Sequence, residues 1–311
     1  MALLEIKDLQ TQFFTSAGTV KAVDGVSYTV EEGETVAVVG ESGSGKSVTA
    51  MSIMRLIPWP PGKIVGGSID FDGKDLLALT DDEMRSIRGR DIGMIFQEPM
   101  TSLNPVLTIG MQLTEPMIAH LGMSEEAAME KAKKLLGLVG ISEPDRRLAQ
   151  YPHHLSGGMR QRVVIAMALA CDPKLIIADE PTTALDVTVE ASVVDLVKEL
   201  GQKYGTSMLF ISHNLGLVLE TCDRICVMYS GEAVERGSIA DVFDEMQHPY
   251  TQALFRSIPL PGADKAARPL RAIPGNFPLP HERPPGCNFG PRCDYFVEGL
   301  CDAREIPMFD V

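Results

Sequence analysis

The chain has 311 residues, of which 45% are apolar and 23% are charged, and its formal net charge is −14. This acidic balance and the lack of a basic run exclude nucleic acid as the main partner, because clustered lysine and arginine are needed to hold phosphate backbones. No apolar stretch approaches the roughly 18 residues that could span a bilayer, and the first ten residues lack the features of a secretion signal.

Strand-like and helix-like segments alternate from Leu3 to about Ile258, which predicts an α/β fold. Within this stretch, Thr35 to Val39 is typical of a buried strand, and Ser47 to Ile57 carries apolar residues at helical spacing. Between them, Gly40 to Ser47 matches the phosphate-loop pattern of two glycines flanking four residues, followed by lysine and serine. The order of strand, glycine turn and helix is the one that this pattern requires.

The residue types of the loop suit a triphosphate. Glycines let backbone amides converge on phosphate oxygens, the start of the helix adds its positive end, and Lys46 supplies a full charge. The Ser47 hydroxyl is placed to ligate Mg²⁺. We therefore predict that a nucleoside triphosphate and Mg²⁺ are bound through Gly40, Ser42, Gly43, Ser44, Gly45, Lys46 and Ser47, and the family resemblance described below implies that the nucleotide is ATP.

The middle of the chain divides into three kinds of segment. Gly66 to Leu77 alternates around a turn, which indicates an antiparallel edge piece. A predicted strand over Ile92 to Phe96 ends at Gln97. Residues from about 101 to 160 are helical in pattern and predict a helical insertion in the α/β core. The clearest part is Ser124 to Val139, where one helix face is predicted to carry Ala127, Ala128, Ala132, Leu135, Leu136 and Val139.

Further chemistry-bearing residues come at the ends of predicted elements. Ser156 is a good helix cap, and Gly157 and Gly158 leave the first amides of the helix that follows open to an anion. Leu175 to Glu180 is an apolar run that delivers two carboxylates at its end, and His213 follows the apolar run from Met208 to Ser212.

Leu155 to Gln161 resembles the signature motif of ATP-binding cassette ATPases, and the other motifs occur in that family's order from about Leu3 to Ile258. The resemblance implies a P-loop core with an antiparallel β subdomain, a helical subdomain and a loop-rich extension. It also implies that two cassettes pair head to tail, with the phosphate loop of one facing Ser156, Gly157 and Gly158 of the other.

The resemblance implies a role for each remaining site residue. Asp179 assists Mg²⁺ through its coordination shell, Glu180 polarises the attacking water, and Gln97 touches both Mg²⁺ and water. His213 matches the switch histidine that contacts the γ-phosphate, and Asp186 matches the loop that crosses between the paired cassettes.

One aromatic side chain is expected to stack on the adenine base. Phe14 stands where family members place that aromatic residue, with Phe13 as a competitor. A phenylalanine beside a strand is otherwise usually a core residue.

Three stretches narrow the resemblance to bacterial peptide and nickel importer ATPases, namely Gln97 to Pro105, His248 to Leu254, and Pro284 to Cys293. We expect an ATPase subunit that drives uptake of dipeptides or oligopeptides, peripheral to the cytoplasmic face of the inner membrane. Its expected partners are a related second ATPase, two permeases and an external substrate-binding protein. A homodimer, a nickel or other small-solute importer, and a soluble cassette ATPase outside transport remain alternatives.

The composition changes after Ile258, since ten of the 21 prolines fall between Pro259 and Pro307. We therefore expect a nucleotide-binding domain over residues 1–258 and a loop-rich extension over residues 259–311. The extension holds Cys287, Cys293 and Cys301, whereas the other three cysteines are expected to be packing residues.

The spacing of the three extension cysteines fits no common zinc or ferredoxin motif. In relatives that this tail resembles, four cysteines can hold a four-iron cluster, but no fourth cysteine follows Cys301 here. An iron–sulfur cluster, a structural zinc ion and three free thiols remain open.

Overall fold

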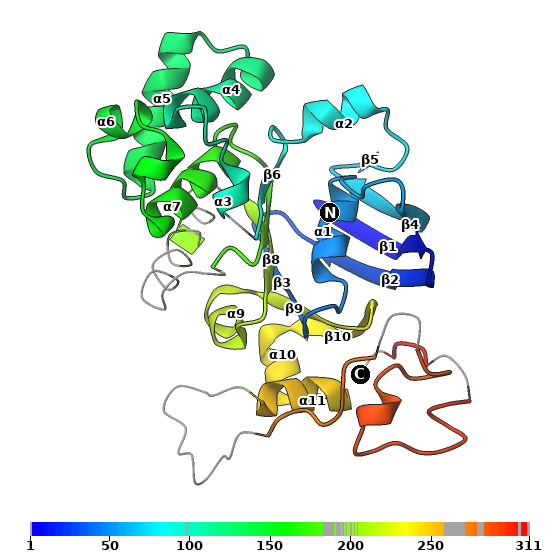
Figure 1. Cartoon of the computed structure of the whole chain (residues 1–311). Coiled ribbons are helices and arrows are strands. Elements are labelled where there is room, and N and C mark those ends of the chain that lie inside the picture. The colour runs from blue at the N-terminus through cyan, green and yellow to red at the C-terminus, as the bar shows by residue number, and fades with distance from the viewer. Residues whose placement is uncertain are drawn as a thin grey trace. The chain divides into compact units, whose positions relative to one another are not determined.

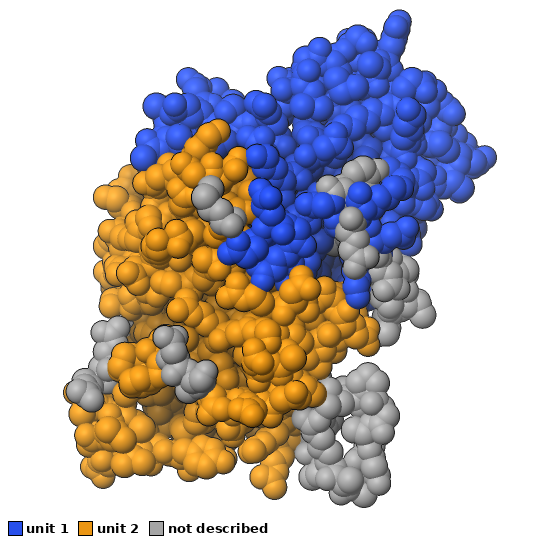
Figure 2. Space-filling model, turned by 180° about the vertical axis from the view of Figure 1, so that it is seen from behind, with its two compact units in different colours: residues 1, 31–35, 78–211 blue, residues 2–30, 36–77, 212–311 orange. Residues whose placement is uncertain are grey.

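The computed structural model describes residues 2–97, 99–182, 190, 194, 196, 198–199, 201, 203, 205–257, 271–278, 283–303 and 306–309 (Figure 1). The chain divides into two compact units, which Figure 2 shows in different colours. The first unit contains residues 31–35 and 78–211, and the second contains residues 2–30, 36–77 and 212–311.

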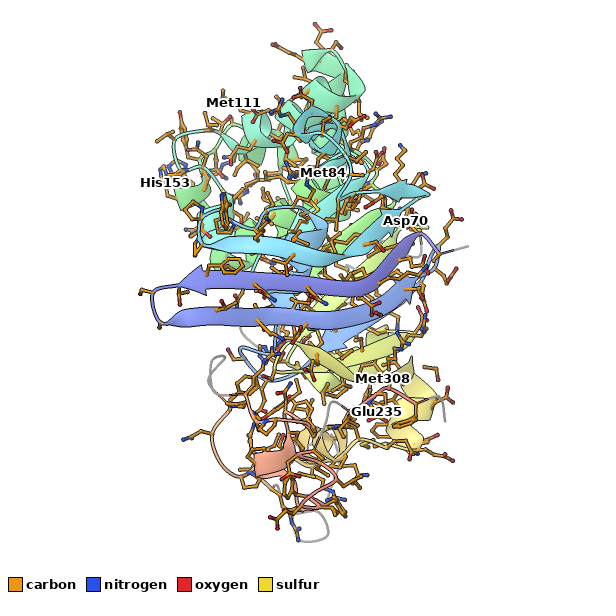
Figure 3. All side chains as sticks on the ribbon, turned by 90° about the vertical axis from the view of Figure 1, so that its right-hand side faces the viewer. Asp70, Met84, Met111, His153, Glu235 and Met308 are labelled. Atoms are coloured by element: carbon orange, nitrogen blue, oxygen red, sulfur yellow. The ribbon has the colours of Figure 1, made fainter. Side chains whose placement is uncertain are left out.

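The second unit contains an antiparallel sheet in the order β2-β1-β4-β5. The alternating pattern of the strands buries one row of side chains, among them Leu4, Ile6 and Ile69, which are at most 1% exposed. Figure 3 shows β1 and β2 lying side by side. The predicted antiparallel piece over residues 66–77 is confirmed, and the strands are β1 (Leu4–Thr15), β2 (Gly18–Val30), β4 (Gly62–Phe71) and β5 (Lys74–Asp75).

The predicted strand before the phosphate loop is also confirmed, as β3 (Thr35–Val39). In the second unit its residues from Val36 onward pair in parallel with β9 (Arg224–Tyr229), and β10 (Glu232–Ser238) pairs antiparallel with β9. Helix α1 (Lys46–Ile53) follows the loop. It is shorter than predicted because the chain leaves the helical conformation at Arg55, whose φ is 49°.

In the first unit, the parallel strands β6 (Ile92–Ile95), β7 (Leu175–Asp179) and β8 (Ser207–Ser212) pair in that order, as far as Ile211 in β8. Their apolar runs are buried, as expected for parallel strands with both faces covered. Parallel strands present their carboxyl ends at one edge, so Gln97 and Glu180 follow neighbouring strands at the same edge.

Helices form most of the rest of the first unit. Ser124 caps α5, and the predicted apolar face is confirmed for Ala128, Ala132, Leu135 and Leu136, whereas Ala127 in the first turn is exposed. The helices are α2 (Asp81–Ile87), α3 (Pro99–Ser102), α4 (Ile109–Leu121), α5 (Glu125–Leu138), α6 (Pro144–Leu148), the 3-10 helix η1 (Pro152–His154) and α7 (Gly157–Ala168).

The second unit continues with α9 (Leu215–Thr221), α10 (Ile239–Asp244) and α11 (Pro249–Arg256). In the described residues after 270, the only regular element is the 3-10 helix η2 (Gly290–Arg292), so the extension is rich in loops as predicted. No helix in the described part of the chain is long and apolar enough to cross a membrane.

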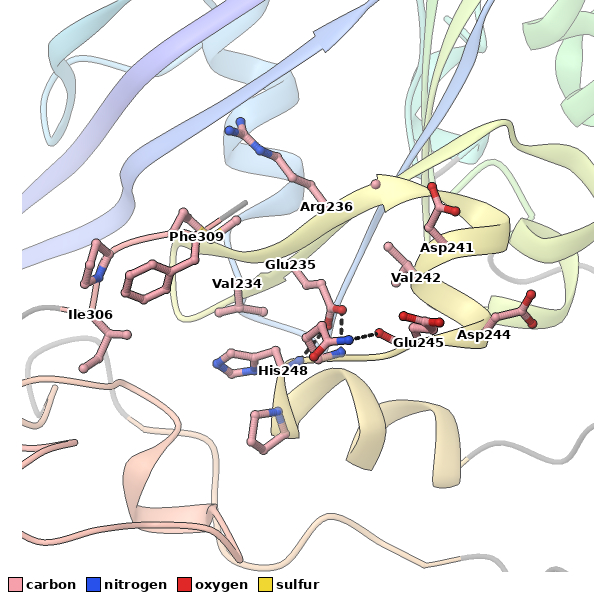
Figure 4. A pocket seen from close by; sticks show the side chains of 15 residues that line it. Val234, Glu235, Arg236, Asp241, Val242, Asp244, Glu245, His248, Ile306 and Phe309 are labelled. Carbon is pink, nitrogen blue, oxygen red and sulfur yellow. Dashed lines mark hydrogen bonds between the residues drawn. The ribbon is translucent and has the colours of Figure 1, made fainter. Parts of the chain in front are cut away.

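A pocket of about 650 Å³ lies in the second unit among β10, α10 and residues 306–309 (Figure 4). Glu235 lines it, and the carboxylate accepts hydrogen bonds from the backbone amides of Gln247 and His248 at 2.8 and 3.0 Å.

Candidate nucleotide site

The phosphate loop lies between β3 and α1 in the second unit. The Lys46 ammonium donates hydrogen bonds to the backbone carbonyls of Gly40 and Glu41 at 2.9 and 3.0 Å, and the lysine is only 5% exposed. Ser44 is fully buried, whereas Ser42 and Gly43 are exposed and Ser47 is half-buried. The loop therefore wraps around the Lys46 side chain, and Ser42 and Gly43 form an exposed rim of small residues.

Two glycines of the loop are required by the packing of the chain itself. Gly40 and Gly45 have φ values of 151° and 101°, which L side chains rarely adopt. A Cβ atom on Gly40 would collide with the carbonyl oxygen of Met228, and one on Gly45 would collide with that of Ala22. The backbone of the loop thus approaches its neighbours so closely that no side chain fits.

The loop is also held from outside by residues that the sequence analysis missed. The Glu41 carboxylate forms an ion pair with Arg292, and the Glu41 amide donates to the Tyr250 hydroxyl at 2.8 Å. No sequence spacing indicated these contacts, because Arg292 and Tyr250 lie far along the chain and belong to no phosphate-binding pattern.

The candidate catalytic carboxylates lie at the end of β7 in the first unit. Asp179 is the last residue of the strand and is 5% exposed. Glu180 has a φ of 47°, and its amide donates to the Ile211 carbonyl at 3.0 Å, which fixes the turn that presents the side chain. The Gln97 side-chain amide donates to the Glu180 carboxylate at 2.8 Å, so the structure brings these two predicted residues together.

The signature segment begins helix α7, also in the first unit. The Ser156 hydroxyl accepts a hydrogen bond from the Met159 amide at 3.4 Å, which confirms the predicted cap. Ser156 and Gly157 are exposed. The helix therefore starts at an accessible position, as an anion site requires.

Gln161, the last residue of the signature segment, makes a contact that the sequence analysis did not foresee. Its side-chain amide donates to the carbonyl of Pro181, the residue after Glu180. Gln161 is 1% exposed. This buried hydrogen bond joins the signature helix to the carboxylate segment within one unit.

Three further residues were predicted for the site, namely His213, Phe14 and Asp186. His213 follows β8 and is exposed, and Phe14 is 45% exposed near the end of β1, with its ring 6.3 Å from that of Trp59 in an edge-to-face arrangement. Both belong to the second unit. Asp186 lies outside the described residues.

The extension cysteines share one loop region, but they do not form a metal site. The Cys287 amide donates to the Cys301 carbonyl at 2.7 Å, and the Tyr295 and Val297 amides approach the sulfur atoms of Cys293 and Cys301 at 3.4 and 3.5 Å. Across the described residues, no group of three or more His, Cys, Asp or Glu side chains is arranged to hold a metal. Of the three alternatives that the sequence leaves open for these cysteines, the structure therefore does not support the iron–sulfur cluster.

Two of the extension thiols have pKa values above the ordinary value of cysteine. Burial raises the pKa of Cys287 and Cys293, although backbone amide hydrogen bonds oppose this shift. The other three cysteines, Cys171, Cys222 and Cys226, were predicted to be packing residues, and all three are buried. Burial raises the pKa of Cys226 to about 12.

The chain thus carries a phosphate loop on one unit and, on the other, a pair of strand-end acids with an open helix start. The family model described as "ABC transporter" matches residues 23–183, and a second, described as "Oligopeptide/dipeptide transporter, C-terminal region", matches residues 234–301. The chain belongs to the ABC transporter family.

Curated relatives match over nearly the whole chain. The oligopeptide transport ATP-binding protein AppD of Bacillus subtilis is 54% identical over 94% of this chain and 88% of its own length. The oligopeptide transport ATP-binding protein OppD of the same species is 51% identical over 99% of this chain and 86% of its own length. A putative peptide import ATP-binding protein of Brucella melitensis is 52% identical over 99% of this chain and 94% of its own length.

Solved structures share the fold. The dimeric post-hydrolysis state of the ATP-binding cassette MJ0796 with ADP and Pi is 31% identical, with a TM-score of 0.68, over 76% of this chain and 98% of that one. The cbiO1 protein of Clostridium perfringens, part of the transporter complex cbiONQ, is 26% identical with a TM-score of 0.66 over 78% of this chain and 91% of that one. The fold predicted from sequence is confirmed.

Proposed function

We propose that this chain is the ATP-hydrolysing subunit of an ABC importer that takes up oligopeptides or dipeptides. The match over residues 234–301 to the C-terminal region of oligopeptide and dipeptide transporters carries the proposal. The full-length similarity to relatives named for oligopeptide and peptide import supports the same cargo class.

In this proposal the loop over residues 40–47 binds the triphosphate. The amides of the exposed rim at Ser42 and Gly43 face the phosphates, and Lys46 exchanges part of its hydrogen bonding to the loop carbonyls for the outer phosphates. Phe14 stacks on the adenine, which its exposure permits.

The donor set also suits a magnesium ion, because hydroxyl, amide and carboxylate oxygens are the hard ligands that Mg²⁺ prefers. Ser47, Gln97 and Asp179 would hold it, directly or through water. When bound, Mg²⁺ neutralises charge on the β- and γ-phosphates.

Glu180 is proposed to orient and polarise the water that attacks the γ-phosphate. The hydrogen bond from Gln97 at 2.8 Å holds the carboxylate in place, and the turn at Glu180 aims it beyond the end of β7. His213 contacts the γ-phosphate and so distinguishes ATP from ADP.

A second ATPase subunit completes each site. The open start of α7, with Ser156, Gly157 and Gly158, would bind the triphosphate held by the facing subunit, and Asp186 would lie where the subunits cross. A related but different ATPase is the proposed partner. ATP favours the closed pair, and hydrolysis releases it.

Two permeases and an extracytoplasmic binding protein complete the proposed importer, with this chain peripheral to the cytoplasmic face of the bacterial inner membrane. The permeases would dock on the helical region that follows Gln97. We also propose that residues 1–258 form the nucleotide-binding domain and residues 259–311 an extension of it. An iron–sulfur cluster at Cys287, Cys293 and Cys301 has no part in this mechanism, and iron and sulfide analysis of anaerobically purified protein would detect one.

Uptake by cells tests the cargo. A strain lacking this chain should lose uptake of labelled oligopeptides or dipeptides, and wild type should restore it, whereas Lys46→Met should not. Nickel uptake measured in the same strains is the control. Loss of nickel uptake with normal peptide uptake would reject the peptide proposal in favour of a metal importer, and loss of neither would indicate a role outside these two transport classes.

A further inference from the structure

The phosphate loop contains one acidic residue, Glu41, and the C-terminal extension neutralises it. Arg292 donates to the two carboxylate oxygens of Glu41 at 2.8 and 3.1 Å, in the two-point geometry that makes arginine–carboxylate pairs strong. The Arg292 side chain is 5% exposed and that of Glu41 is 28% exposed. The pair is therefore largely removed from water, where screening is weak.

Arg292 is itself fixed on all sides. Its Nε donates to the Pro274 carbonyl at 2.9 Å, its Nη1 donates to the Tyr229 hydroxyl at 3.3 Å, and its guanidinium lies 5.9 Å from the centre of the Tyr229 ring. Burial acts to lower the pKa of Arg292, but hydrogen bonds to Glu41 and Tyr229 oppose burial and raise it overall. The arginine is thus a rigid, permanently charged contact.

An aromatic cluster supports the same loop. The Tyr229 ring lies 4.6 Å from that of Tyr250, 5.0 Å from Phe277 and 5.3 Å from Phe289, measured between centroids. The Tyr250 hydroxyl binds the Glu41 amide, and the Phe277 ring is 3.7 Å from the position of a Cβ on Gly43. Phe277, Phe289 and Arg292 all belong to the extension, so the extension packs directly against the loop.

A second arginine of the extension, Arg283, binds residues next to the phosphate loop. Arg283 forms an ion pair with Asp24 at 2.8 Å and also donates to the carbonyls of Lys21 and Ser230. Gly231, the residue after Ser230, donates its amide to the Ser44 carbonyl of the loop at 2.9 Å. Two arginines of the extension thus reach the phosphate loop, one directly and one through the turn at Ser230.

The negative charge of Glu41 bears directly on the binding of a triphosphate by the loop. A carboxylate in a loop that must receive a triphosphate repels the ligand unless a fixed positive charge offsets it. The Arg292 pair offsets the charge and draws the carboxylate to the side of the extension.

We propose that Arg292 is a positioning residue of the nucleotide site, through which the docked extension sets the affinity of the phosphate loop for ATP. Because coupling between two binding events is reciprocal, ATP must in turn stabilise the docked extension. The extension is then a functional part of the nucleotide site and a point at which nucleotide affinity is controlled. This inference rests on the proposed ATP site in the loop.

A double-mutant cycle between Arg292 and Glu41 tests the pair. Binding of a non-hydrolysable ATP analogue is measured for wild type, Arg292→Met, Glu41→Gln and the double variant. Arg292→Met should weaken binding about tenfold or more, because it leaves a half-buried carboxylate without its partner beside the triphosphate. The double variant should bind more tightly than Arg292→Met, since the unpaired charge is gone.

Two further variants separate positioning from general damage. Arg292→Lys keeps the charge but loses the two-point geometry, so its affinity should fall between wild type and Arg292→Met. Arg271→Gln alters an exposed arginine of the same extension and should bind like wild type. Hydrolysis by Arg292→Met at saturating ATP should stay within about twofold of wild type, so that KM rises while kcat is kept.

Hydrogen exchange tests the reciprocal effect on the unaltered full chain and does not depend on a variant that folds. The analogue should slow exchange in residues 283–303. Equal affinity in wild type and Arg292→Met, a double variant no better than the single one, or unchanged exchange would each overturn the inference. Failure of wild type to bind the analogue would instead reject the proposed function.

Discussion

Glycines occur both in the phosphate loop of the second unit and at the start of helix α7 in the first unit, but they have different surroundings. At Gly40 and Gly45 an added Cβ would collide with backbone carbonyls of the chain itself. At Gly157 an added Cβ would meet no heavy atom of the described residues within 4 Å. Internal packing therefore requires glycine in the phosphate loop but does not require it at the start of α7.

Under the proposed function, the two regions supply opposite halves of a nucleotide site formed with a facing subunit, and they differ in how each is shaped. The phosphate loop is held in its shape by Glu41, Lys46 and the residues around them, so its conformation is set by contacts within the chain itself. The start of α7 has an exposed serine and an unobstructed glycine. Under the proposed function, the ligand that explains the absence of a side chain there is the nucleotide of a facing subunit.

The largest expected effect is that of Glu180→Gln, which should reduce ATP turnover by roughly 10²- to 10⁴-fold because the attacking water loses its base. ATP should still bind and should hold this variant in the paired state, since hydrolysis no longer releases it. Turnover by enzymatic phosphate assay and mass by light scattering, with and without ATP, measure both effects. If this variant bound ATP tightly but stayed monomeric in the presence of the proposed partner ATPase, the result would contradict the proposal that the start of α7 binds the nucleotide of a facing subunit.

The next effect separates the two kinds of glycine. Gly157→Ala should leave the unfolding temperature unchanged within a few degrees, because the site is open, but should lower turnover by about tenfold or more by obstructing the first amides of α7. Gly40→Ala should lower the unfolding temperature itself, because its Cβ collides with Met228. Thermal unfolding and turnover of the two purified variants are the measurements. Equal stability losses in both would contradict the distinction.

A smaller effect concerns the adenine. Phe14→Ala should weaken ATP binding by about 2- to 10-fold, the range expected for loss of one aromatic stacking contact. Trp59, the single tryptophan of the chain, lies 6.3 Å from Phe14 and serves as the reporter, so ATP should change its emission in wild type and less in the variant. Phe13→Leu is the matched control. If ATP did not change the emission of Trp59 and Phe14→Ala bound ATP as tightly as wild type, the proposed stacking of Phe14 on the adenine would be wrong.

The smallest effect is a pH dependence in the support of the phosphate loop. His248 Nδ1 accepts a hydrogen bond from the Tyr250 amide at 3.1 Å, and burial lowers the pKa of His248 below 6.5, although Glu235 opposes this shift. The unfolded chain therefore binds the proton more readily. Stability from this group is present above pH 6.5 and is lost as the pH falls from there through the folded pKa.

Urea unfolding at about pH 8 and about pH 5.5, on either side of the ordinary histidine pKa, measures this dependence, with His248→Asn as the control. Asparagine caps helix α11 without titrating in this range. Wild type should lose more stability between the two pH values than the variant does. Equal losses would show that His248 does not contribute to the acid sensitivity.

Local patterns in the sequence predicted the parts of the fold that depend on neighbouring residues. The buried run before the phosphate loop, the cap at Ser156 and most of the apolar face of α5 are decided within a few residues and are confirmed. The prediction for Ala127 was wrong because the first turn of α5 is exposed on that side. The end of α1 was missed because the turn at Arg55 has no glycine or proline to mark it.

Pairings between distant residues could not be predicted from local patterns. Gln97 and Glu180 meet because β6 and β7 are neighbours in a sheet, and only the family resemblance placed both residues at one site. Arg292 lies in a stretch that indicated the importer subfamily but belongs to no phosphate-binding pattern, and Glu41 occupies a variable position of the loop pattern, so nothing in their local sequences indicates that they form a pair.

The pair between Glu41 and Arg292 joins residues 251 positions apart. At ribosomal elongation rates of about 5–20 residues per second, roughly 12 to 50 seconds pass between synthesis of the acid and synthesis of its arginine. A nascent chain thus carries a nearly complete phosphate loop long before it can neutralise Glu41. Under the proposed role of Arg292, a chain truncated before that residue would bind ATP more weakly than one that contains it.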